Sequence, residues 1–89
     1  MDLEEYSLDF KPGWDEHFKG FDKESRKRIV AKLKQMKQPL QGRGLHSSRY
    51  LVKEVGGYRI AYICDEANKT KHIHFVGNHK QYEKWCSCL

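Results

Sequence analysis

The sequence lacks the even number of spaced cysteines of a disulfide framework, and it has no long apolar run. Its three cysteines, Cys64, Cys86 and Cys88, are an odd number, and the last two are too close together for an ordinary disulfide framework. Such usage is typical of a reducing compartment, so we predict a cytoplasmic protein. The first residues are acidic rather than basic and apolar, and no apolar run approaches the ~18 residues of a membrane span. We therefore expect neither a secretion signal nor a membrane partner.

Acidic residues are scarce after the first 18 positions. Residues 1–18 carry six acidic side chains and one basic side chain, a net charge of −5, whereas residues 19–89 carry sixteen basic and six acidic side chains, a net charge of +10. A body this basic attracts polyanions such as RNA, because neutralised phosphates release their counterions. A basic surface that serves only solubility remains the alternative.

A β-hairpin at residues 49–63 organises the chain, which we expect to form a single domain over residues 1–89. Two runs rich in Tyr, Val and Ile meet at Gly56-Gly57, and this pair can adopt the positive φ values of a type I′ or II′ turn. Antiparallel pairing then places Glu54 opposite Arg59.

The two faces of the hairpin differ in polarity, because successive side chains of a strand point to opposite faces. The face predicted to lie on the core contains Leu51, Lys53, Val55, Tyr58, Ile60 and Tyr62. The face predicted to be open to solvent contains Tyr50, Val52, Glu54, Arg59, Ala61 and Ile63. Arg59 is not needed for folding on such a face, and it is therefore a candidate for function.

Three elements are predicted before the hairpin. Residues 6–10 alternate apolar and polar side chains, which predicts a strand. A short helix is expected over residues 12–20, with Trp14, Phe18 and Phe21 on one face. Asp22 is the predicted N-cap of a second, amphipathic helix that ends before Pro39. The two helices are expected to form a hairpin packed on the sheet.

A third strand of the meander is predicted over residues 71–77, and the tail after it is either a short helix or an irregular cover. With a turn centred on Ala67-Asn68, the predicted partners are His72 with Ile63, His74 with Ala61, and Val76 with Arg59. This register places Ile73 and Phe75 in the core. The expected fold is α+β, an antiparallel sheet of about four strands with an N-terminal helical hairpin on one face.

The open face would bring together the side chains that phosphodiester cleavage requires. A base takes the proton from the attacking hydroxyl, an acid protonates the leaving oxygen, and a cation holds the phosphate. Aromatic rings can stack on exposed RNA bases. The residues predicted to gather here are Arg59, Tyr50, His72 and His74 from the strands, His79, Lys80 and Tyr82 after the last strand, and Arg43 and Arg49 in the loop before the hairpin.

Two segments carry a resemblance to a known family. The motifs Val-Gly-Gly-Tyr-Arg-Ile-Ala-Tyr at residues 55–62 and Val-Gly-Asn-His-Lys-Gln-Tyr at residues 76–82 follow a strand, a helical hairpin and a loop with Leu-x-Gly. In this order and spacing, residues 6–85 resemble the RelE/ParE superfamily of toxins from type II toxin–antitoxin systems. The His-x-x-Tyr ending is most similar to the RelE, HigB and YafQ branches.

The resemblance implies a small endoribonuclease that cuts mRNA in the ribosomal A site. The 2′-hydroxyl is the nucleophile in this reaction, which uses no metal or other cofactor. The resemblance also implies two partners, the mRNA on the 30S ribosome and a dedicated antitoxin, which would lay an amphipathic helix or strand across the basic surface.

The same resemblance assigns roles to individual residues. Arg59 corresponds to the strand arginine that contacts the scissile phosphate, His79 to a general acid or base, and Tyr82 to an aromatic residue that stacks on or orients a nucleotide. Lys53 and Arg49 lie near a strand position where relatives carry basic catalytic residues. The predicted RNA-binding residues are Lys53, Arg49, Arg43 and Lys80.

Each assignment has a structural alternative. Arg59 could form an ion pair with Glu54 across the hairpin, and His79 could cap the strand end or lie on the surface. Tyr82 could close the sheet edge. Lys53 falls on the predicted core face, where it could extend along the apolar surface to solvent.

A zinc site is a further alternative, built from His72, His74 and His79 with cysteine ligands. It is disfavoured because Cys64 and His72 lie on opposite faces in the predicted register and the chain has no paired Cys-x-x-Cys knuckle. We therefore predict no metal.

Two rival functions remain open. The first is a ParE-like inhibitor of DNA gyrase, which would act by binding rather than by catalysis. The second is a relative without catalytic activity that binds only RNA or the antitoxin.

Overall fold

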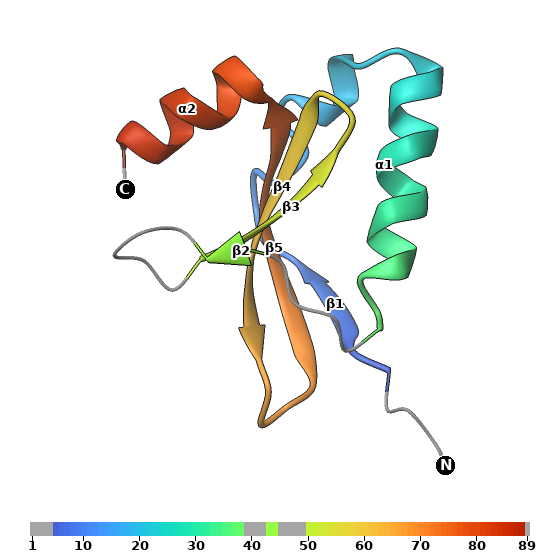
Figure 1. Ribbon diagram of the computed structural model, residues 1–89, viewed down its shortest axis with the longest axis vertical. Helices are drawn as coiled ribbons and strands as arrows, with labels where there is room; N and C mark the ends of the chain where they lie inside the picture. The colour runs from blue at the N-terminus through green and yellow to red at the C-terminus, as the bar shows by residue number, and fades with distance from the viewer. Residues whose placement is uncertain (1–4, 39–42, 45–49, 89) are drawn as a thin grey trace.

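The centre of the fold is a sheet with the strand order β1-β5-β4-β3-β2 (Figure 1). The computed structural model describes residues 5–38, 43–44 and 50–88. The strands are β1 (Ser7–Phe10), β2 (Arg43–Gly44), β3 (Leu51–Val55), β4 (Tyr58–Asp65) and β5 (Thr70–Asn78). The helices of the described part are a short 3₁₀ helix, η1 (Phe18–Gly20), and two α-helices, α1 (Lys23–Gln35) and α2 (His79–Ser87). The predicted α+β class is confirmed.

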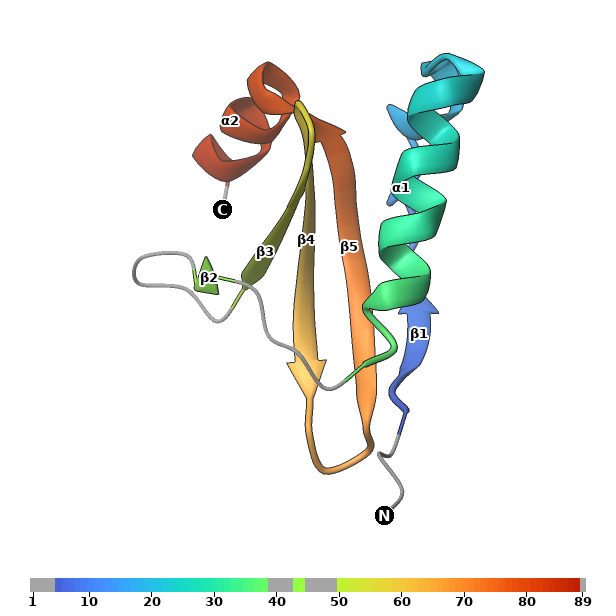
Figure 2. The ribbon, with the colours of Figure 1, turned by 45° about the vertical axis from the view of Figure 1, so that its right-hand side comes forward.

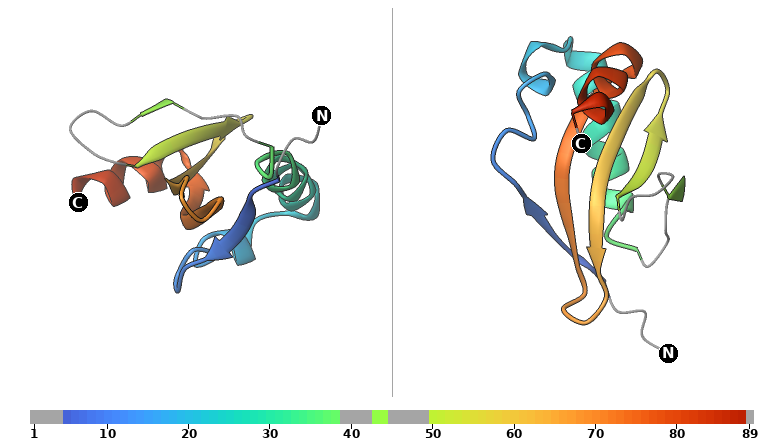
Figure 3. Two further views of the ribbon diagram at one scale, coloured as in Figure 1. Left: turned by 90° about the horizontal axis from the view of Figure 1, so that it is seen from below. Right: turned by 90° about the vertical axis from the view of Figure 1, so that its left-hand side faces the viewer.

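The direction of β1 corrects the predicted antiparallel sheet. Strands β2 to β5 pair antiparallel, whereas β1 pairs in parallel with β5, Ser7 opposite Thr70 and Phe10 opposite Ile73. Figure 3 shows β1 alongside β5 at one edge. Parallel neighbours need a long crossover connection, and the segment from β1 to the hairpin contains α1. The sheet is therefore mixed, and the two-residue β2 is a strand beyond those predicted.

The hairpin formed by β3 and β4 has the predicted register. Val55 lies opposite Tyr58, Glu54 opposite Arg59, and Leu51 opposite Tyr62. Gly56 has a φ of +55°, in the left-handed region that favours glycine. The prediction that this turn sets the register of the hairpin is confirmed.

The predicted helix over residues 12–20 is wrong. Turns occupy residues 12–17, and the last three residues of the predicted helix form the 3₁₀ helix η1. Gly13 has a φ of +86°, which no right-handed helix contains. Trp14, Phe18 and Phe21 still pack against the core, as predicted. The expected helical hairpin is thus one α-helix preceded by a compact turn.

Helix α1 follows Asp22 and covers one face of the sheet, which we call the α1 face. Ile29 and Leu33 of α1 and Met36 at its C-cap are buried, as the predicted stripe requires. They pack against residues of the predicted core face, with Ile60 and Tyr62 fully buried. This layer is the larger of the two apolar cores.

A bulge in β5 corrects the predicted register of the third strand. His72 lies opposite Ile63, as predicted, but the register shifts between Ala61 and Tyr62. Phe75, rather than His74, faces Ala61, and Gly77, rather than Val76, faces Arg59. A bulge adds one residue to one strand and reverses the faces of those that follow. Phe75 therefore leaves the α1 face.

Val76 takes the place in the α1 core that was predicted for Phe75, and its side chain is fully buried. Phe75 instead joins Val52, Ala61 and Tyr82 in a second apolar cluster. The bulge thus supplies an aromatic side chain to the other side of the sheet.

Helix α2 covers part of the face that was predicted to be open. Tyr82 belongs to the second cluster, and Trp85 and Cys86 pack against it. Figure 2 shows α1 and α2 on opposite sides of the sheet. We call this side the α2 face. The helical alternative for the tail is confirmed, whereas the expectation of a wholly open face is wrong.

The junction between β5 and α2 depends on two local features. The side chain of Asn78 accepts a hydrogen bond from the Gln81 backbone N–H at 2.8 Å, and the Gln81 side chain accepts one from the Asn78 N–H at 2.8 Å. This capping box fixes the start of α2. A Cβ at Gly77 would lie 2.5 Å from the Phe75 ring. The ring packs against the backbone of residue 77, and only glycine leaves room for it.

Candidate functional site

Arg59 lies at the centre of the candidate site, on the α2 face of β4. Its Nη2 atom is 3.4 Å from Oε2 of Glu54 on the neighbouring strand. Its Cζ atom lies 5.1 Å from the centre of the Tyr82 ring on α2. The side chain is 26% exposed. Strand β4, strand β3 and helix α2 therefore each contribute one side chain to this group.

The ion pair between Arg59 and Glu54 was predicted as an alternative to a functional role, and it is present. A guanidinium has five N–H donors in a planar fork, and one carboxylate does not use them all. A cation–π contact holds the plane of the group without using a donor. Arg59 is thus held in place while part of it remains accessible to a phosphate.

Tyr82 is buried, with 6% of its surface exposed. Its ring packs with Phe75 and Trp85 at centroid distances of 6.3 and 6.2 Å. In this arrangement the Tyr82 ring packs against the Arg59 guanidinium. The aromatic residue that is partly exposed on the α2 face is Trp85.

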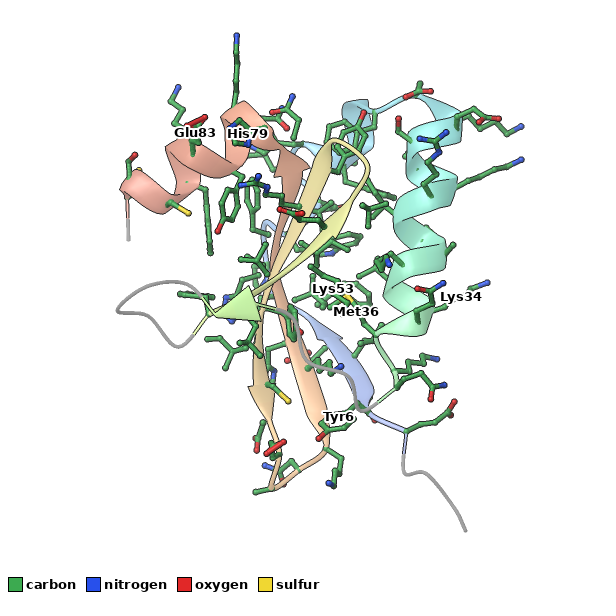
Figure 4. The ribbon with its side chains drawn as sticks, viewed as in Figure 1. Tyr6, Lys34, Met36, Lys53, His79 and Glu83 are labelled. Atoms are coloured by element: carbon green, nitrogen blue, oxygen red, sulfur yellow. The ribbon has the colours of Figure 1, made fainter. Side chains whose placement is uncertain are left out.

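His79 is the first residue of α2, and its side chain is 58% exposed. Its Nε2 atom is 3.1 Å from Oε1 of Glu83, one helical turn further on. Figure 4 shows the two side chains next to each other on α2. The imidazole is accessible, as a group that exchanges protons with a substrate must be.

The predicted RNA-binding residues fall in different places. Lys80 is exposed beside His79. Lys53 lies opposite Ile60 and therefore on the α1 face. The structure does not bring Lys53 together with Arg59, because the hairpin has no bulge that would turn it. Arg43 lies in β2, and its role stays a prediction; Arg49 lies outside the described residues.

An aromatic cluster at Trp85 was not predicted. Trp85 stacks on Phe75 at 5.0 Å with an interplanar angle of 20°. Tyr50 meets Trp85 edge to face at 5.1 Å and His74 at 5.2 Å. The spacing of Tyr82 and Trp85 places both on one side of a helix, and this was the available signal. The use of Phe75 could not be foreseen without the bulge.

A pocket of about 560 Å³ lies on the side of α2 nearer to β1. Its walls come from the turn after β1, from β5 and from α2, and they include Glu16, His17, Phe75, Lys84 and Trp85. Sequence analysis did not predict it, because the turn was expected to be a helix.

A second group of titratable side chains joins β1 to β5. The Oδ2 atom of Asp9 lies 2.7 Å from Nδ1 of His72 and 2.7 Å from Nζ of Lys11. Hydrogen bonds from Lys11 and His72 lower the pKa of Asp9. His72 was predicted on the open face with Arg59, but it is four residues from Arg59 in the ladder and is paired with Asp9. This group ties the parallel edge strand to the sheet.

The zinc alternative has little geometric support. Among the residues that the structure describes, no three histidine, cysteine or acidic side chains come together as the ligands of a metal would. Cys64 faces the α1 core, and His72 faces the other side, as predicted.

No helix in the described ranges has both the length and the apolar character needed to cross a membrane.

Comparison with known proteins identifies the fold. No family model and no curated protein matches the sequence. Among solved structures, the RelBE2 toxin–antitoxin complex of Mycobacterium tuberculosis matches with a TM-score of 0.72 and 16% identity, over 88% of this chain and 95% of that chain. The isolated Escherichia coli RelE toxin matches with a TM-score of 0.65 and 19% identity, over 94% and 99%.

The intact E. coli RelBE toxin–antitoxin complex matches with a TM-score of 0.66 and 20% identity, over 82% of this chain and 95% of that chain. These likenesses cover nearly the full length of each solved chain. They confirm the predicted resemblance at the level of architecture. The chain therefore has the fold of the RelE toxins.

Proposed function

We propose that this protein is the toxin of a type II toxin–antitoxin system and that it cleaves mRNA in the ribosomal A site. The proposal is supported by the RelE fold and by the basic charge of residues 19–89. The observation that carries it is the placement of Arg59 and His79. Arg59 lies opposite Gly77 near the end of β5, and His79 follows two residues later at the start of α2. A fixed cation and an accessible imidazole therefore flank the junction of β5 and α2.

In the proposed reaction the RNA 2′-hydroxyl attacks the adjacent phosphorus, and the bond to the 5′-oxygen of the next nucleotide breaks. Arg59 stabilises the negative charge that develops on the phosphate. His79 exchanges a proton with the attacking or leaving oxygen. Tyr82 positions Arg59 through the contact between ring and guanidinium.

Lys80 is proposed to bind a phosphate next to the cleaved one, because it is exposed and follows His79 on α2. Arg43 and Arg49 keep their predicted role in RNA binding. Lys53 is proposed to contact RNA only from the α1 side. The remaining partner is an antitoxin, and the proposed compartment is the cytoplasm, where translated mRNA is present.

Primer extension on a translated mRNA tests this function. Purified protein should create new 5′ ends that require ribosomes, and Arg59→Ala should reduce their formation about 100-fold or more, since removing one charge-stabilising donor costs roughly that much. The free energy of unfolding should fall by less than about 1 kcal/mol, because the pair with Glu54 is partly exposed.

Arg26→Ala, on the exposed surface of α1, is the matched control and should cleave as the native protein does. If Arg59→Ala lowers the melting temperature as severely as it lowers cleavage, the role of Arg59 is structural. Uncut mRNA with folded protein would reject the nuclease.

The pairing of the site residues supports a second candidate, a relative that only binds RNA or the antitoxin. Arg59 already has Glu54 and Tyr82 as neighbours, and His79 has Glu83. If this reading is correct, cell growth is inhibited equally by the native protein and by the variant with both Arg59→Ala and His79→Ala.

A further inference from the structure

We propose that the pocket beside α2 binds a purine base of the RNA, and guanine in preference to the other bases. The inference rests on the proposed function, since it supposes an RNA ligand. The pocket holds about 560 Å³, within the range of sites that enclose small ligands. It is formed by three segments that are distant in the sequence, the turn after β1, the bulged part of β5, and the second half of α2.

The walls of the pocket favour a flat aromatic ligand. Phe75 and Trp85 stack on each other, with an interplanar angle of 20°. The ring of His17 approaches Phe75 edge to face at 5.7 Å. Trp85 is only partly buried, so its ring is available at the pocket. Bases stack on such side chains in complexes of proteins with single-stranded RNA.

Two charged side chains at the pocket indicate which base it prefers. Glu16 contributes a carboxylate that is 78% exposed, and Lys84 contributes an ammonium group. A carboxylate only accepts hydrogen bonds and can accept two side by side. Guanine offers two adjacent donors, N1–H and N2–H₂, whereas adenine and cytosine have an acceptor next to their amino group. Lys84 can neutralise the phosphate of the same nucleotide.

The position of the pocket places this base next to the cleavage site. Arg59 lies on the β4 side of α2 and the pocket on the β1 side, so the two are separated by the helix. An α-helix with its side chains is about 10–12 Å wide. The bound base would thus belong to a nucleotide that flanks the cleaved phosphate, and Glu16 would determine sequence preference.

Titration of the full chain with nucleoside monophosphates tests the proposal without ribosomes. The probes are GMP, AMP, CMP and UMP, followed by NMR of the backbone amides. We expect GMP to bind most tightly and to shift the amide signals of residues 13–17 and 84–88. Glu16→Gln should weaken GMP binding about tenfold, which is typical for the loss of a bidentate contact to a base, and should leave AMP binding unchanged.

Glu24→Gln, the same change on the exposed surface of α1, is the control and should bind GMP as the native chain does. Equal affinity for all four nucleotides, or GMP binding that survives Glu16→Gln, would overturn the proposal. Amide signals of the pocket that shift with an antitoxin peptide but not with GMP would also overturn the proposal, because the pocket would then be a binding site for a protein. Specific GMP binding without ribosome-dependent cleavage would support the pocket and reject the nuclease.

Discussion

At the scale of single residues, Glu54 has the most direct influence on the candidate site. Its carboxylate is 3.4 Å from the Arg59 guanidinium, which a substrate phosphate would also approach. A carboxylate so close repels the phosphate, and two unit charges at about 4 Å interact by roughly 1 kcal/mol in water. Glu54 therefore holds Arg59, and in the proposed function it would also compete with RNA for it.

Glu54→Gln should increase the affinity for single-stranded RNA about fivefold, because it removes this repulsion and retains a hydrogen-bond acceptor. Fluorescence anisotropy with a labelled oligonucleotide measures the change. Glu24→Gln on α1 removes the same charge far from Arg59 and should have a smaller effect. Weaker binding by Glu54→Gln would mean that the carboxylate mainly positions the arginine.

Lys71 is a second residue whose environment has measurable consequences. Its side chain is fully buried, and its Nζ donates a hydrogen bond of 2.8 Å to the backbone carbonyl of Gln38. The ring centres of Tyr6 and Tyr62 lie 5.0 and 5.6 Å away. Burial lowers the pKa of Lys71 from its ordinary value of 10.5. The folded state therefore binds fewer protons here than the unfolded state does.

Stability should then rise with pH between the lowered folded pKa of Lys71 and about 10.5, because the unfolded chain binds more protons in that window. Lys71→Met should abolish this rise and should be as stable as the native chain near pH 7, or up to about 2 kcal/mol more stable. Urea unfolding from pH 7 to about pH 10 measures both.

The pKa of Tyr6 is raised in the fold, so Tyr6 lowers stability as the pH rises, but only above its ordinary pKa of 10.0. Its unfolded form loses a proton first there, so stability would fall. If the free energy of unfolding of the native chain does not change with pH below about 10, Lys71 keeps its proton in the folded state.

At the scale of elements, the junction of β5 and α2 builds the α2 face. Gly77→Ala should destabilise the protein by about 1–3 kcal/mol, as overpacking typically does. The added Cβ would lie 2.5 and 2.9 Å from atoms of the Phe75 ring and 3.1 Å from Cβ of Gln81. Denaturant unfolding measures the loss.

Gly20→Ala is the control for this change, because a Cβ at Gly20 has no atom within 4 Å. A loss confined to Gly77→Ala would confirm that the ring beneath the strand end requires glycine. Equal losses would point to general effects of removing a glycine.

The same elements show what sequence reasoning can determine. The register of the hairpin and the start of α1 follow from Gly56-Gly57 and Asp22, since both signals are local. The buried stripe of α1 follows from periodicity. Placement of Arg59 on the α2 face, opposite Glu54, was therefore predictable.

The features that were missed depend on contacts between distant segments. The bulge at His74 leaves no signature in the alternation of residues 71–77, and it decides which side Phe75 occupies. The parallel pairing of β1 depends on the path of the whole chain. The burial of Lys71 depends on Tyr6, Tyr62 and Gln38, which meet only in the fold.

At the scale of the whole molecule, charge is unevenly shared between the first 18 residues and the rest of the chain. The net charge of +5 is the difference between an acidic segment and a strongly basic body. RNA binding by the body should therefore depend steeply on salt. Each phosphate that is neutralised contributes about −0.7 to the slope of log K against log salt for single-stranded RNA.

Lys80→Ala should make that slope shallower by about 0.7 if Lys80 contacts one phosphate. Lys34→Ala removes a lysine that projects outward from α1 in Figure 4 and should leave the slope unchanged. Anisotropy titrations at several salt concentrations give both slopes. Equal changes in the two variants would indicate that RNA responds to total charge rather than to a defined path along α2.

The parallel pairing of β1 with β5 also determines when the molecule can fold during its own synthesis. Ser7 meets Thr70, so most of the described chain must leave the ribosome before the first strand gains its neighbour. Pairings between such distant residues form late and slowly. The same holds for α2, which follows β5 directly. A chain still under translation thus lacks both the sheet edge and the helix beside Arg59, and the proposed cleavage site stays incomplete until the residues of α2 have left the ribosome.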